Sequence, residues 1–225
     1  IRSLLNQALD RSEYEIIVVD GNSTDKTVRI SRKLGAKVYH ENKGSIGHAR
    51  NVGAKNGRGK IVAFLDADCI APRGWLLRIK KTFSRKPELK GLGGFGVPIN
   101  GRWQDRLAFV IINYYCKLAS WLGLYQFSGY NCVFKREDFL ESGGFNPEIK
   151  YLEDSEFSIR FSGGGKRKCK FSRRLTVFVS PRRLVQMGVL KSGFLCVFGY
   201  FCLIIKKKFP WDYSKLIYKW GLLDR

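Results

Sequence analysis

Apolar residues in the first hundred positions form short runs that alternate with stretches of helical periodicity. The Val- and Ile-rich runs at 14–19 and 60–65 each stop at an aspartate, and such runs bounded by turn residues predict buried strands. A third run at 36–40 follows a helical pattern that ends at Gly35, a residue type that commonly follows the last turn of a helix. Alternating strands and helices predict an α/β fold with a mainly parallel sheet flanked by helices.

The chain changes character after about residue 100. Residues 106–127 are aromatic-rich, with Lys117 as the one charged side chain after Arg106, and residues 193–205 form an apolar run closed by the lysines at 206–208. Neither segment reaches the roughly 18–20 uninterrupted apolar residues that a membrane-spanning helix needs. Two interpretations stay open: helices of the core, or helices on a membrane surface with the lysines at anionic head groups.

Acidic residues follow two of the predicted strands. Asp20 ends the first strand, and Asp66 and Asp68 come directly after the third. In parallel α/β sheets, ligands bind beyond the carboxyl ends of the strands, so we expect both groups to line one crevice. Asp20 alone would also fit a turn, because Asp, Gly and Asn are turn formers.

The pair Asp66 and Asp68 has the spacing of a metal site. Two carboxylates two residues apart, just past a strand, can present oxygens to a hard cation such as Mg²⁺ or Mn²⁺. A cation held there can neutralise a diphosphate. The structural alternative is a solvated strand end or a helix cap, and the second acid at the neighbouring strand end favours the metal site.

A second acidic group opens a predicted helix at residues 151–161. Glu153, Asp154 and Glu156 crowd its first turn, where the helix dipole favours negative charge. Structure alone could therefore explain these acids. A carboxylate that faced the crevice could instead serve as a general base for a hydroxyl acceptor.

The net charge of +22 is the unusual feature of the composition, and residues 166–225 carry 15 Lys and Arg against only Asp212 and Asp224. Such a surface attracts polyanions: anionic lipid, phosphorylated substrates or nucleic acid. No nucleic-acid module signature is present, so nucleic acid is not the expected partner. The six cysteines contain no C-x-x-C pair and there are only two His, which argues against zinc and favours a reducing compartment.

Five segments, in this order and spacing, resemble the family 2 glycosyltransferases of the GT-A fold. The resemblance covers roughly residues 1–180. The segments are IRSLLNQ, EIIVVDGNSTDKT, ENKGSIGHARNVGAKNGRGKIVAFLDADC, GYNCVFKREDFLESGGFNPEI and YLEDSEFSIR.

The resemblance implies a nucleotide-sugar site in the first half of the chain. Asp20 would hold the nucleobase, with Asn22 beside it, and Arg50 would lie near the nucleotide. Asp66 and Asp68 would be the family's D-x-D motif. Asp68 is the surer ligand of Mn²⁺ or Mg²⁺, and Asp66 would lie nearer the ribose and sugar.

The resemblance also implies the catalytic groups. Asp154 would be the catalytic base, with Glu153 as its neighbour, and GYNCVFKRE would lie beside the acceptor. Enzymes of this kind invert the anomeric centre in one displacement, in which the acceptor hydroxyl loses its proton to the base.

The sequence departs from the family pattern in three places. The usual first strand of the type V-S-V-I-I-P is absent and the chain opens without Met, so we expect a longer natural protein. The common V-D-D-G-S reads Val19-Asp20-Gly21-Asn22-Ser23, with one acid lost. The Q-x-x-R-W motif of processive synthases is absent, and SPRRLVQMG stands in its place, which favours transfer of a single sugar.

We therefore expect a GT-A domain over residues 1–180, with a nucleotide-sugar half at 1–98 and an acceptor half at 99–180, followed by a basic, partly apolar helical extension at 181–225. The expected function is an inverting, metal-dependent glycosyltransferase acting on a glycan or polyprenyl-phosphate acceptor, peripheral on the cytoplasmic face of a membrane. The alternatives are a nucleotidyltransferase that uses the same acids, and a non-catalytic basic module that binds membrane or nucleic acid.

Overall fold

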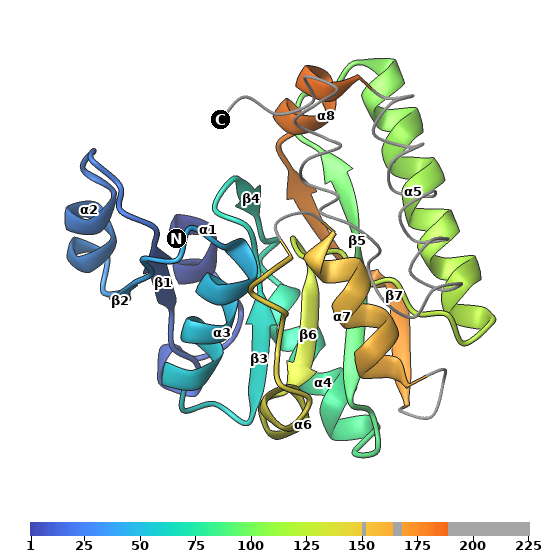
Figure 1. The fold of residues 1–225 in the computed structure, drawn as a ribbon, viewed down its shortest axis with the longest axis horizontal. Helices are drawn as coiled ribbons and strands as arrows, with labels where there is room; N and C mark the ends of the chain where they lie inside the picture. Colours follow the sequence, from blue (N-terminus) through green and yellow to red (C-terminus); the bar gives the residue numbers. More distant parts are fainter. Residues whose placement is uncertain (150–151, 164–167, 189–225) are drawn as a thin grey trace.

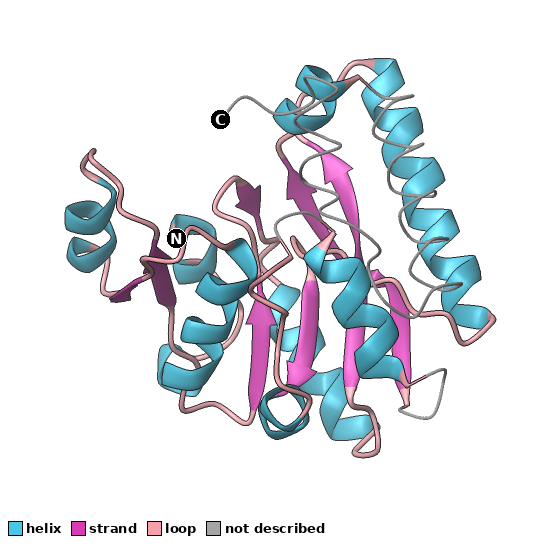
Figure 2. Ribbon diagram, viewed as in Figure 1, coloured by secondary structure: helices cyan, strands magenta, loops and turns pink. Residues whose placement is uncertain are grey.

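The computed structural model describes residues 1–149, 152–163 and 168–188 (Figure 1). Two sheets with helices packed on them make up this part of the chain (Figure 2). The fold is therefore α/β, as the alternating pattern of the sequence predicts.

The first sheet has two parallel strands, β1 and β2, in register from Ile17 opposite Lys37 to Asp20 opposite His40. The chain reaches it through a short helix and a 3-10 turn, and two further helices flank it. These elements are α1 (Arg2–Leu5), η1 (Arg11–Glu13), β1 (Ile17–Asp20), α2 (Thr27–Lys33), β2 (Lys37–His40) and α3 (Ile46–Asn56). Gly35 follows α2 with φ +77°, which matches the predicted helix end.

The second sheet has five strands in the order β3-β6-β5-β7-β4. Their bounds are β3 (Ile61–Phe64), β4 (Cys69–Ile70), β5 (Gly91–Pro98), β6 (Cys132–Lys135) and β7 (Cys169–Val179). β5 and β7 pair in parallel, whereas β6 runs antiparallel to both neighbours and β4 antiparallel to β7. The expectation of a mainly parallel sheet thus holds for β1–β2 and β5–β7, and the sheet as a whole is mixed. No periodicity in a strand encodes the direction of its partner.

Helices cover both faces of the five-stranded sheet. The helices in this part of the chain are α4 (Trp75–Arg85), α5 (Trp103–Trp121), α6 (Arg136–Glu141), α7 (Glu153–Ser162) and α8 (Arg182–Met187), of which α8 follows the end of β7. Val133 packs in the cluster that includes α4, while its neighbours Cys132 and Phe134 pack in the cluster that includes α6 and α7. Successive strand side chains point to opposite faces, so α4 and α7 lie on opposite sides of the sheet.

The core beneath α6 and α7 is aromatic. Its rings approach to centroid distances as short as 4.5 Å, between Phe145 and Phe157. Truncating a buried Phe costs roughly 3–5 kcal/mol, so this cluster holds the first turn of α7 firmly against the sheet. Its phenylalanines are Phe64, Phe127, Phe134, Phe139, Phe145, Phe157 and Phe161.

The two predicted halves of the domain share one sheet. β6, from the second half, lies between β3 and β5 of the first half. The aromatic segment that begins near residue 106 forms α5, which packs on β5 and β7. No helix in the described residues is long and apolar enough to span a bilayer. The run at 193–205 and most of the predicted extension fall outside the described residues, and the domain boundaries stay predictions.

Candidate active site

Arg50 joins two acids that lie far apart in the sequence. Its Nη1 donates to Glu153 Oε1 at 2.6 Å and its Nη2 donates to Asp66 Oδ1 at 3.0 Å. The side chain is 11% exposed and projects from α3, whose first turn is capped by Ser45. Burial alone would lower the pKa of Arg50, but Asp66 and Glu153 raise it above its usual value, so the guanidinium stays charged.

The backbone around Arg50 leaves room for little else. A Cβ on Gly129 would lie 2.3 Å from Arg50 Nη2, so only glycine admits the guanidinium at this point. On another side, the guanidinium lies over the Phe145 ring at 5.2 Å. A buried charge is tolerated when its partners are well placed, and this packing fixes Arg50 between its two carboxylates.

Asp154 lies next to Glu153 in the first turn of α7. Its Oδ2 accepts a hydrogen bond from the Gly129 backbone N–H at 3.0 Å. Burial, followed by the neighbouring Glu153 charge, raises the pKa of Asp154 to about 6, although Arg50 and the Gly129 hydrogen bond oppose the shift. A carboxyl group tuned toward neutrality is suited to taking a proton at physiological pH.

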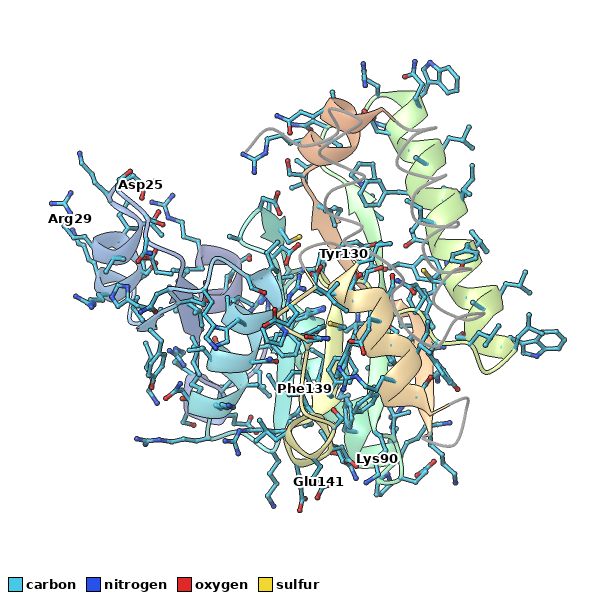
Figure 3. All side chains as sticks on the ribbon, in the orientation of Figure 1. Asp25, Arg29, Lys90, Tyr130, Phe139 and Glu141 are labelled. Atoms are coloured by element: carbon cyan, nitrogen blue, oxygen red, sulfur yellow. The ribbon has the colours of Figure 1, made fainter. Side chains whose placement is uncertain are left out.

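The backbone before α7 is strained. Leu152 has the left-handed conformation, φ 60° and ψ 28°, and its side chain is buried. A non-glycine residue in this region costs roughly 1–3 kcal/mol and persists only where the surroundings fix it. This turn aims Glu153 and Asp154 at α3 and at the loop before β6. Tyr130, labelled in Figure 3, lies at that same loop.

Asp66 and Asp68 lie in the turn between β3 and β4. The Cys69 N–H donates to the Asp66 carbonyl at 3.0 Å, and the Ser180 N–H donates to the Asp68 carbonyl at 3.2 Å. The Asp66 and Asp68 side chains are 29% and 32% exposed. The turn therefore holds both carboxylates at the surface of the site, open to solvent and ligand.

These two carboxylates fit a small divalent cation in part. Mg²⁺ is commonly held by one or two protein carboxylates together with substrate phosphates and water. The described residues contain no cluster of three or more His, Cys, Asp or Glu that could hold a metal by itself. An ion held by this pair would need to complete its coordination with water or with a phosphorylated molecule.

Asp20 and Asn22 lie on the other sheet. Asp20 ends β1, its side chain is 2% exposed, and its oxygens accept from the Ser23 N–H at 3.2 and 3.4 Å. The Ser23 hydroxyl and amide, with His40 at 3.5 Å, lower the pKa of Asp20. Asn22 is exposed with φ 70°. Within the described residues, no hydrogen bond or ion pair joins Asp20 to Arg50, Asp66 and Glu153, which are called the Arg50 group below. The crevice that Asp20 and the Arg50 group were expected to share therefore stays a prediction.

Two groups in the site had no clear signal in the sequence. Arg182, at the start of α8, lies 3.8 Å from Asp68 through Nη2 and Oδ2, although the sequence marks it only as part of a basic run. The Gly129 N–H holds Asp154, although its segment is predicted only to lie near the acceptor. Both contacts join segments far apart in the chain, which local patterns do not encode.

Three of the four cysteines in the described residues are buried, and Cys169 is half-buried. Cys69, Cys116 and Cys132 are buried, and burial raises the pKa of the Cys132 thiol well above its usual range. A buried thiol that resists ionisation is a poor nucleophile. Asp154 is therefore the better candidate for chemistry in this region. Cys196 and Cys202 lie outside the described residues.

Comparisons with known proteins place the fold. The mannosyltransferase PcManGT of Pyrobaculum calidifontis, solved with GDP-Man and Mn²⁺, superimposes with a TM-score of 0.64 at 19% identity, over 88% of this chain and 59% of that one. TarS 1-349 of S. aureus, solved with UDP-GlcNAc, gives a TM-score of 0.63 at 22% identity, over 80% and 53%. The architecture is that of the GT-A fold.

Sequence comparisons lead to the same family. Over 165 residues the chain is 30% identical to the glucosyl-dolichyl phosphate glucuronosyltransferase of Haloferax volcanii. The aligned region covers 65% of this chain and 50% of that protein. The chain spans only about a fifth to a half of the curated relatives first matched. The model of glycosyl transferase family 2 matches residues 1–143, more than half of the chain. The protein therefore belongs to glycosyl transferase family 2.

Proposed function

We propose that the protein is an inverting, metal-dependent glycosyltransferase that moves one sugar from a nucleotide-diphosphate sugar to a hydroxyl or phosphate acceptor. The proposal rests chiefly on the position of Asp154. Its carboxyl group has a raised pKa, accepts a hydrogen bond from the Gly129 N–H and lies beside the Arg50 group. Membership in the family supports this function over the nucleotidyltransferase and over the non-catalytic module.

Asp154 is the general base. Its ionised carboxylate takes the proton of the acceptor hydroxyl as that oxygen attacks the anomeric carbon, and the bond from that carbon to the diphosphate breaks on the opposite side. One displacement of this kind inverts the anomeric centre. Arg50 is bonded to Glu153, so it offsets the negative charge next to the base and favours the ionised form of Asp154 that accepts the proton.

The donor lies between the two acidic strand ends. Asp20 binds the nucleobase, with Asn22 in the same turn, and Asp66 lies nearer the ribose and sugar. Arg182, already beside Asp68, is placed to meet the negative charge of a diphosphate. Asp68 and Asp66 would hold Mn²⁺ or Mg²⁺, which supplies electrostatic stabilisation of the leaving diphosphate when it is bound.

The acceptor is a glycan or a polyprenyl phosphate, and the enzyme is peripheral on the cytoplasmic face of a membrane. The name of the Haloferax relative, which describes transfer to a glucosyl-dolichyl phosphate, supports a lipid-linked acceptor. The net charge of +22 favours an anionic surface as partner. The lack of Q-x-x-R-W supports transfer of one sugar per event.

A product assay tests the proposal. UDP- and GDP-sugars are offered with polyprenyl-phosphate and glycan acceptors, with Mn²⁺ or with EDTA, and the anomeric configuration of the product is read by NMR. We expect one donor to give an inverted, singly extended product that EDTA and Asp68→Asn abolish. Glu141→Gln, at an exposed position on α6 labelled in Figure 3, is the matched control and should keep full activity. A retained anomeric configuration, or activity indifferent to Asp68→Asn, would overturn the mechanism.

A further inference from the structure

The outer side of α5 is apolar along its whole length. Eight large side chains there are exposed, by fractions from 47% for Tyr114 to 81% for Trp121. Single exposed apolar residues are normal on a protein surface, whereas a group of this size on one helix marks an interaction site. The eight residues, called the α5 outer face below, are Trp103, Leu107, Val110, Ile111, Tyr114, Leu118, Trp121 and Leu122.

The spacing of these residues makes the face continuous. At about 100° per residue, the eight positions fall within an arc of about 120°. The opposite arc of α5 holds Ala108, Phe109, Cys116 and Ala119, which are buried on the side that packs against β5 and β7. A helix that is apolar on both sides is normally covered on both, and Figure 1 shows α5 along one edge of the described fold, with α8 near its upper end.

Charge on α5 is one-sided. Arg102, Arg106 and Lys117 are exposed, and on the same ideal helix Arg106 and Lys117 fall side by side along one border of the apolar arc. The one acid of the helix, Asp105, is 1% exposed and accepts from the Arg102 backbone N–H. The surface that α5 presents is therefore apolar with a cationic border and no exposed anion.

The most exposed residues of this face are tryptophans at its two ends. Trp103 is 70% and Trp121 is 81% exposed. Tryptophan, with an apolar ring and one N–H, is favoured at the boundary between hydrocarbon and water. Helices that lie in the plane of a bilayer combine such an apolar face with Lys and Arg beside it. A protein partner would need no uniform cationic border, whereas an anionic lipid surface does.

We propose that the α5 outer face docks on an anionic lipid bilayer. This inference rests on the proposed function, and it names the surface through which the enzyme would meet the membrane. The inner side of α5 packs next to the active site. The ring centroids of Phe109, on α5, and Tyr130 are 6.4 Å apart. Tyr130 follows Gly129, whose N–H donates to Asp154. One helix thus links the bilayer to the catalytic base, at which a lipid-linked acceptor would arrive.

Vesicle flotation tests the docking without any sugar transfer. The full chain is mixed with phosphatidylcholine–phosphatidylglycerol vesicles at low salt, and its variant Leu107→Glu/Ile111→Glu/Leu118→Glu is compared with Leu5→Glu/Ile30→Glu/Ile46→Glu. Both variants replace three exposed apolar residues and change the net charge equally. We expect the α5 variant to lose at least tenfold in vesicle affinity, the control to stay within twofold of the wild type, and all three to keep their melting temperature.

Tryptophan fluorescence gives a second readout on the folded wild type. Brominated phosphatidylcholine, mixed with phosphatidylglycerol, should quench Trp103 and Trp121, and Trp103→Phe/Trp121→Phe should remove most of the quenching. Absence of wild-type flotation overturns the proposal, as does equal flotation of the two Glu variants. Two further results, taken together, also overturn the proposal: the α5 variant melts at a much lower temperature, and bromolipid quenches Trp103→Phe/Trp121→Phe as strongly as the wild type. The α5 outer face would then be covered by another part of the chain. A wild-type dimer that the α5 variant converts to a monomer, without vesicle binding, would assign the face to a second copy.

Discussion

The two acidic strand ends look alike in the sequence, but the structure holds them in different ways. Asp20 is bonded to its own turn, through Ser23, and to a half-exposed His40. Asp66 is bonded to Arg50 from α3, which in turn binds Glu153 from α7. A carboxylate held by its own turn depends on a few neighbouring residues, whereas one held through Arg50 depends on three distant segments. We therefore expect changes in the Arg50 group to have the larger consequences.

The largest effect is expected from the base. Asp154→Asn removes the proton acceptor while keeping an oxygen for the Gly129 N–H, so kcat should fall by roughly 10²–10⁴-fold, the usual contribution of a general base. KM for the donor should change little. Steady-state kinetics of the purified variant measures both, and a kcat within tenfold of wild type would remove Asp154 from the mechanism.

Removing the cation of the Arg50 group should be the costliest change for stability. Arg50→Met leaves Glu153 and Asp66 without their partner, and breaking a buried pair in this way typically costs about 3–5 kcal/mol. Lys37→Met is the control, since it breaks an ion pair of the same 2.6 Å length at the surface, where such a pair contributes about 0–1 kcal/mol. Urea unfolding compares the two variants, and equal losses would show that the Arg50 group is no more coupled than a surface pair.

The raised pKa of Asp154 predicts a trade between stability and activity. Folding raises this pKa from 3.8 to about 6, so the folded state favours the protonated form of Asp154. The stability that this group contributes is fully present below about pH 4 and is lost as the pH rises through 6. Asp154→Asn cannot ionise, so at pH 7.5 it should be more stable than wild type, by up to about 3 kcal/mol, with the difference vanishing near pH 4. Melting temperatures measured from pH 4 to 8 test the sign, and wild-type kcat should rise through about pH 6.

The smallest effect is expected at the other strand end. Asp20→Asn removes a charged acceptor for the nucleobase, so KM for the donor should rise by roughly 3–10-fold, the size of one hydrogen bond, with kcat nearly unchanged. A kcat loss as large as that of Asp154→Asn would erase the distinction between the two strand ends.

The elements that could be predicted are those with a local pattern. The Val-rich strands at 17–20 and 61–64, and the acids opening α7, all carry periodicity or capping chemistry that neighbouring residues determine. The antiparallel insertion of β6 between β3 and β5 could not be predicted, because strand direction depends on the path of the whole chain. The hydrogen bond from Arg50 to Glu153 joins residues 103 positions apart in the sequence. The family resemblance implied only that Arg50 lies near the nucleotide, and it did not indicate Glu153 as its partner.

The most direct test of a nucleotide-diphosphate site at the Asp66–Asp68 turn is ligand-dependent stability. UDP, GDP, CMP and dTDP are added to the wild type, Asp68→Asn and Glu141→Gln, each with Mn²⁺ or with EDTA, and unfolding is followed by temperature. A ligand present at 100 times its dissociation constant adds about 2.7 kcal/mol to the folded state. We predict that one nucleoside diphosphate stabilises wild type and Glu141→Gln only with metal, and leaves Asp68→Asn unchanged. Stabilisation that persists in EDTA, or in Asp68→Asn, would contradict the account.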